Sequence, residues 1–163
     1  MRAYARRFGE NEELWGVVGL LHDLDYERHP DPETGHPRQA MAELERRGAP
    51  AEVVRAIASH ADYLGVSRDS AMEKALYAVD ELSGFLVACA YVRPQGIHGL
   101  SAKSVRKKLK QASFAAAVDR DALRRAASDL GVDFDEHVEF VVAALTERAD
   151  ELELHGPQPA AAD

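Results

Sequence analysis

Residues 14–21 read Leu-Trp-Gly-Val-Val-Gly-Leu-Leu, a nearly uninterrupted apolar run that predicts a buried, central helix. Asn11 is a typical N-cap residue, and the two glutamates after it place negative charge where a helix dipole favours it. His22 and Asp23 follow the run directly. Two side chains of metal-ligand type therefore stand where the chain leaves its most apolar helix.

The rest of the chain also shows helical spacing of apolar residues, with no useful alternating run, so we predict an all-α fold. A Pro-rich surface loop is expected over 26–37, and Ser70 with Glu73 forms a capping box. We expect one helical domain over 1–155 and a disordered tail over 156–163. Further helices are predicted over residues 38–47, 51–63, 70–93, 103–111, 121–130 and 134–152.

The composition narrows the function classes. The chain has 163 residues, 46% of them hydrophobic, and a net charge of −8, so we expect no nucleic-acid polymer and no membrane surface as a partner. No apolar stretch is long enough to span a bilayer, and we predict a cytoplasmic protein. Cys89 is the only cysteine and is expected to be an inert core residue. Any metal would therefore bind through His and carboxylate groups.

Three further residues are candidate ligands. Asp80 is expected on the buried side of its helix, where a carboxylate is costly unless it is paired or metal-bound. His60 falls on the apolar stripe of its helix, and His36 lies in the Pro-rich loop, where a solvated side chain is expected. Each histidine also has a plain structural interpretation as a hydrogen-bonded core or surface residue, and Asp23 could be a turn residue.

A basic helix face stands out in this acidic chain. Lys103, Arg106, Lys107 and Lys110 share one face by their spacing. This face is either a solvated surface paired with acids elsewhere or a surface that captures a substrate phosphate.

Trp15, Phe85 and Tyr91 are interpreted as core packing.

Taken together, these motifs resemble the HD superfamily of metal-dependent phosphohydrolases. The resemblance covers nearly the whole chain, in family order and spacing. It rests on residues 19–26 (GLLHDLDY), 36–37 (HP), 59–62 (SHAD), 78–82 (AVDEL) and 103–109 (KSVRKKL).

The resemblance implies an all-α, compact multi-helix HD-domain bundle that binds a divalent metal, which activates water for attack on phosphorus. By that resemblance His22, Asp23 and Asp80 are metal ligands. His36 and His60 match positions that hold a second metal in the dinuclear branch and otherwise contact phosphate. The donor set suits Mn, Fe, Co, Ni or Zn, and Mg less well.

The sequence departs from the family pattern at two places. Residues 1–21 contain no histidine, although the family carries its first ligand upstream of the doublet, and residues 1–8 resemble the second half of that helix. We expect either a shortened chain or a lost ligand. Ala61 follows His60 where the dinuclear branch tends to have a second histidine, which argues against a second tight metal.

The expected function is hydrolysis of a small phosphorylated metabolite or nucleotide. The predicted catalytic residues are Asp23, His60 and Asp25, with Asp25 or Asp62 orienting the water or the histidines. The predicted substrate-binding residues are His36, Lys103, Arg106 and Lys107. The alternatives are a non-catalytic HD-fold binding module with a degraded metal site and a structural helical domain; the oligomeric state is left open.

Overall fold

The computed structural model describes residues 1–156 and contains eight α-helices, one short 3-10 helix and no strand over that range. The all-α prediction is confirmed. The chain forms two compact units, Met1–Tyr77 and a second that begins at Ala78. The single domain predicted over 1–155 stays a prediction, and the predicted tail lies outside the described residues except for Gly156.

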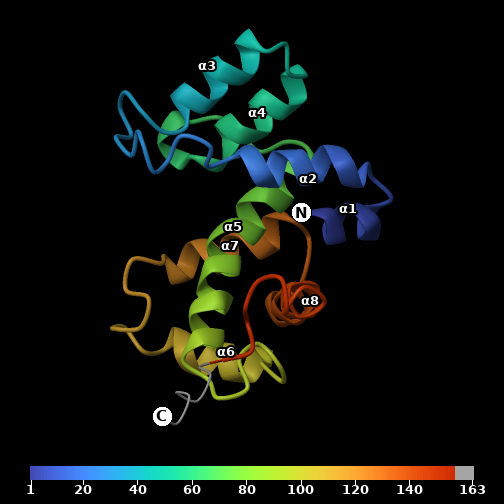
Figure 1. Cartoon of the computed structure of the whole chain (residues 1–163), viewed down its shortest axis with the longest axis vertical. Coiled ribbons are helices and arrows are strands. Elements are labelled where there is room, and N and C mark those ends of the chain that lie inside the picture. Colours follow the sequence, from blue (N-terminus) through green and yellow to red (C-terminus); the bar gives the residue numbers. More distant parts are fainter. Residues whose placement is uncertain (157–163) are drawn as a thin grey trace, which may run out of the picture. The chain divides into compact units, whose positions relative to one another are not determined.

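The first unit is built from short helices (Figure 1). The helix α2 packs on α1 and α4, and α3 packs on α4. Its core includes the buried side chains of Trp15, Val18, Leu44 and Ile57. Trp15 and Val18 place one face of α2 in the core of this unit, but Val17 and Leu20 of the same run are exposed, so the prediction of a buried helix was wrong for its other face. The bounds are Arg2–Phe8 for α1, Glu12–Leu21 for α2, Arg38–Arg46 for α3, Ala51–His60 for α4 and Asp62–Leu64 for the 3-10 helix η1.

Local capping explains where several helices begin and end. The side chain of Asn11 accepts a hydrogen bond from the Leu14 amide at 3.0 Å, which confirms the predicted N-cap of α2. The helix α4 ends at His60, three residues earlier than predicted. Ala61 is extended and precedes η1, which ends before Gly65, a glycine in the left-handed conformation that this residue adopts without strain.

The helix α5 (Ala71–Tyr91) begins in the first unit and continues into the second. Its predicted capping box is present: Glu73 Oε2 accepts from the Ser70 amide at 2.8 Å, and Ser70 Oγ accepts from the Glu73 amide at 3.2 Å. Phe85 and Cys89 are buried as expected. Tyr91 is 57% exposed, so its assignment to the core was wrong, because it is the last residue of the helix.

The second unit continues with α6 (Ala102–Leu109), α7 (Arg120–Asp129) and α8 (Phe134–Thr146), and α8 packs on both α6 and α7. The helix α8 ends six residues before the predicted Leu152. Turns follow it and bury Ala149 and Leu154, whose backbone groups are joined by a hydrogen bond of 2.9 Å. Burial of these apolar side chains favours the turn over further helix.

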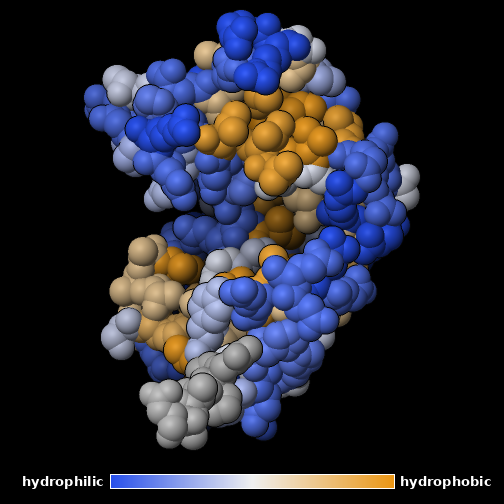
Figure 2. Space-filling model, in the orientation of Figure 1, coloured by the Kyte–Doolittle hydropathy of each residue, from blue (hydrophilic) through white to orange (hydrophobic). Residues whose placement is uncertain are grey.

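The surface of the first unit is not uniformly polar. Figure 2 shows an apolar area among hydrophilic residues on this part of the surface. Apolar side chains that stay exposed on α2 and in the turn after it include Val17, Leu20 and Leu24. No helix among residues 1–156 is long and apolar enough to cross a membrane.

Candidate metal centre

Two histidines stand at the C-terminal ends of helices in the first unit. His22 is the C-cap of α2, and His60 is the last residue of α4. Each ring turns back on its own helix: His22 Nδ1 lies 3.0 Å from the carbonyl oxygen of Gly19, and His60 Nδ1 lies 2.5 Å from that of Ile57. Because a carbonyl oxygen only accepts, both rings donate through Nδ1, and Nε2 of each neutral ring carries the lone pair.

His36 reaches the same place from the loop before α3. It is only 7% exposed, so the solvated side chain expected from the loop composition was wrong. Gly35 allows the loop to close tightly, since a Cβ there would lie 2.2 Å from the His29 carbonyl oxygen. His36 Nδ1 lies 2.8 Å from Asp25 Oδ1, and the Tyr63 hydroxyl donates to the His36 carbonyl at 2.6 Å. These partners are distant in sequence, so local composition does not reveal the burial.

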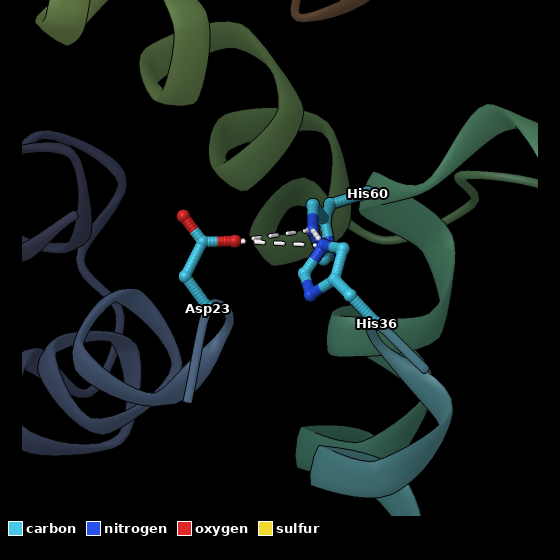
Figure 3. A group of neighbouring side chains, drawn as sticks. All are labelled: Asp23, His36 and His60. Atoms are coloured by element: carbon cyan, nitrogen blue, oxygen red, sulfur yellow. Dashed lines mark hydrogen bonds and ion pairs between the residues drawn. The ribbon is translucent and has the colours of Figure 1, made fainter. Parts of the chain in front are cut away.

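Asp23 completes the group (Figure 3). Its Oδ1 lies 3.5 Å from His36 Nε2 and 3.8 Å from His60 Nε2, and these two nitrogens are 3.1 Å apart. Its Oδ2 lies 3.2 Å from His22 Nε2. The Asp23 side chain is 47% exposed, while His36 and His60 are buried, so the group opens to solvent on the carboxylate side. We call these four residues the His/Asp cluster.

The cluster fits a divalent metal by its donor chemistry. The ligand atoms of Asp23, His36 and His60 all lie within 4.8 Å of one another. Two nitrogens on one ion at about 2.1 Å lie about 3.4 Å apart in tetrahedral geometry, near the separation found between His36 and His60. The lone pair on His22 Nε2 also faces Asp23 Oδ2, and these two electron-rich atoms are stabilised by a positive charge between them.

The electrostatics keep Asp23 ionised. The hydrogen bond from His22, when that ring is protonated, lowers the pKa of Asp23 below its ordinary value, and the charges of His22, His60 and His36 act in the same direction against partial burial. Asp23 is therefore a carboxylate at neutral pH. A bound metal would take the place of the imidazole protons as its counter-charge.

The comparison with protein families agrees with this geometry. The family model described as "HD domain" matches residues 1–84, which is just over half of the chain and includes the whole His/Asp cluster. The chain belongs to the HD domain family. HD domains bind divalent metals and are generally metal-dependent hydrolases. Neither the curated proteins nor the solved structures give a match to this HD domain.

Asp25 and Asp62, the two carboxylates predicted to orient the water or the histidines, differ in what they touch. Asp25 is buried and faces His36, as the sequence allowed. Asp62 instead accepts from Arg68 Nη2 at 2.8 Å and from the Tyr77 hydroxyl at 2.7 Å. Asp25 is thus the carboxylate that contacts a histidine of the cluster, while these bonds hold Asp62 toward Arg68 and Tyr77.

The remaining predicted site residues belong to the second unit of the HD protein. Asp80 lies on α5 and is only partly buried, whereas the sequence predicted a place on the buried side of the helix. Its part in the metal site stays a prediction. Lys103, Arg106 and Lys107 are exposed on α6, opposite the buried Val105. Arg106 Nε donates to Asp135 Oδ1 at 2.6 Å, and Arg106 Nη2 donates to Asp135 Oδ2, so this guanidinium has an acidic partner.

Two tyrosines beside the cluster were missed by the sequence analysis. The ring of Tyr26 meets the His36 ring edge-on, with centroids 5.2 Å apart, and both Tyr26 and Tyr63 are about half exposed. Burial of its hydroxyl raises the pKa of Tyr63 above its ordinary value, which keeps the hydroxyl a donor to His36. Only the tertiary structure places these rings beside a residue 10 or 27 positions away, so no local pattern could identify them.

Proposed function

We propose that this HD domain is a metal-dependent phosphohydrolase that acts on a small phosphorylated metabolite or nucleotide. The observation that carries the proposal is the carboxylate of Asp23 facing the Nε2 atoms of three histidines. An ion held there would supply the Lewis acidity that activates water for attack at phosphorus and offsets negative charge in the transition state.

Different residues of the chain would bind the ion and the phosphate. Asp23 supplies the anionic oxygen ligand, and His22, His36 and His60 supply nitrogen ligands. The half-exposed side of Asp23 leaves an approach for the substrate. Asp80 is proposed as a further ligand. A small substrate suits a chain of net charge −8, because a long polyanion would meet general repulsion.

Phosphate recognition is assigned to His36 and to the basic face of α6. Since Arg106 already pairs with Asp135, Lys103 and Lys107 are the stronger candidates on that face. If they bind the substrate, Lys107→Gln should raise KM several-fold with little change in kcat, because it removes a charge that attracts phosphate in ground and transition state alike. An unchanged KM in both Lys103→Gln and Lys107→Gln would show that this face is a solvated surface that does not bind the substrate.

The deciding experiment measures phosphate release by the full chain with added Mn²⁺, Mg²⁺, Ni²⁺ or Co²⁺. The probes are p-nitrophenyl phosphate, bis(p-nitrophenyl) phosphate and nucleoside monophosphates. Activity should require the metal, vanish with EDTA and be lost in Asp23→Asn. The matched control is Asp31→Asn, since the Asp31 carboxylate accepts from the nearby backbone amides of Glu33 and Thr34 and is not part of the cluster.

The other outcomes identify the alternatives. Metal binding without turnover on any probe would make the chain a non-catalytic HD-fold module. If no divalent ion binds, the proposed function is wrong, and the cluster would be a set of hydrogen-bonded structural residues.

A further inference from the structure

The three histidines of the His/Asp cluster differ in one respect. His22 and His60 donate through Nδ1 to backbone carbonyls of their own helices. His36 instead directs Nδ1 to a carboxylate, Asp25 Oδ1, at 2.8 Å. Asp25 and His36 are 5% and 7% exposed, so this pair is shielded from water and from screening by salt.

Asp25 has a second contact that fixes its orientation. Its Oδ2 accepts from the backbone amide of Ala40 at 2.8 Å. Ala40 is the third residue of α3, where helical amides have no partner within the helix and a negative charge is favourable. The carboxylate is thus held between the start of α3 and the ring of His36, and each oxygen serves one donor.

From these contacts we infer that Asp25 is a positioning residue that holds His36 in its Nδ1-protonated tautomer. A carboxylate only accepts, so the proton must sit on Nδ1, and Nε2 keeps its lone pair toward Asp23 and His60. The anion also makes the ring a stronger donor to a cation than a carbonyl partner would. The tautomer follows from the contacts alone, whereas its effect on metal binding and catalysis rests on the function proposed above.

Replacing Asp25 by Asn tests this role with almost no change in shape. The amide oxygen can still accept from Ala40, and the amide nitrogen then faces His36 Nδ1. The opposite orientation would put two donors against each other at Ala40. The helix start therefore selects the orientation in which the new amide donates to His36, which forces the proton onto Nε2 and turns that atom away from metal binding.

Nitrogen NMR of the full chain, with EDTA at a pH where imidazoles are neutral, measures the tautomer directly. The wild type should show His36 protonated at Nδ1, and Asp25→Asn should show it protonated at Nε2. Calorimetric titration with Zn²⁺ should show affinity about 10- to 100-fold weaker in Asp25→Asn. The control Asp31→Asn makes the same charge change in the same loop and should match the wild type in both measurements.

Each result bears on one claim. A wild-type His36 protonated at Nε2 would overturn the inference without any variant, as would Asp25→Asn with unchanged tautomer and unchanged Zn²⁺ affinity. If Asp25 only caps α3, Asp25→Ala would lose helix in circular dichroism while the His36 tautomer stays unchanged in both Asp25→Ala and Asp25→Asn, and the inference is again wrong. Failure of the wild type to bind Zn²⁺ or release phosphate would instead reject the proposed function, whatever the tautomer.

Discussion

The Nε2 atoms of His36 and His60 lie 3.1 Å apart, although the two residues are 24 positions apart in the sequence. His36 comes from a loop and His60 from the end of α4, and their rings meet at 64°. The His60 tautomer leaves a lone pair on Nε2, so the approach of His36 is favourable only with a positive charge, a proton or a metal ion, between the two nitrogens. This relationship makes the two residues a pair that could hold a cation.

Replacing His60 by Gln should weaken Zn²⁺ binding about 100-fold. The change removes a buried nitrogen ligand while keeping a similar volume, so the affinity should fall more than the thermal stability. Titration calorimetry of the full chain provides the measurement. The matched control is His98→Gln, because His98 is exposed in the second unit, and equal losses in both variants would remove His60 from the site.

Asp80→Asn tests the metal ligand predicted on α5. We expect loss of metal-dependent phosphatase activity with unchanged helix content, since the substitution removes an anionic ligand and no packing group. The neighbouring Glu81→Gln makes an equivalent charge change on the same helix and should retain activity. Activity of Asp80→Asn equal to that of the wild type would show that Asp80 is not a ligand.

Glu73→Ala should lower the free energy of unfolding by about 2–4 kcal/mol. Glu73 is 3% exposed, accepts from the amides of Asp69 and Ser70, and pairs with Arg55 Nε at 2.9 Å, so its loss leaves several donors without an acceptor. Urea denaturation followed by circular dichroism measures the effect. The exposed Glu52→Ala should change stability by less than about 0.5 kcal/mol, and a similar loss in both would contradict the role of Glu73.

Cys89 should make stability fall at alkaline pH. Burial raises the pKa of its thiol to about 11, whereas an unfolded thiol has a pKa of about 8.5. The folded state therefore keeps the proton longer, so the stabilisation is complete below pH of about 8.5 and is lost as the pH rises toward 11. Unfolding free energies of the wild type and Cys89→Ala should converge or cross over this range, and a constant difference would disprove the shift.

The sequence by itself determined the helices, because their signals are local. Each signal acts within a turn or two of helix. The Asn11 cap and the capping box of Ser70 and Glu73 predicted where α2 and α5 begin, and the spacing of apolar residues predicted the all-α class. Errors arose where a helix end depends on long-range burial. The chain after α8 turns to bury Leu154, which helical periodicity could not reveal.

The candidate site divides in the same way. The doublet of His22 and Asp23 at the end of an apolar helix could be identified from the sequence, and the family motif supplied His36 and His60. Only the tertiary structure buried His36, turned Asp25 toward its ring and brought the nitrogens within ligand distance. The reason is physical: side-chain type and spacing set what a residue can bind, whereas the packing of the His36 loop against α4 sets which lone pair faces which neighbour.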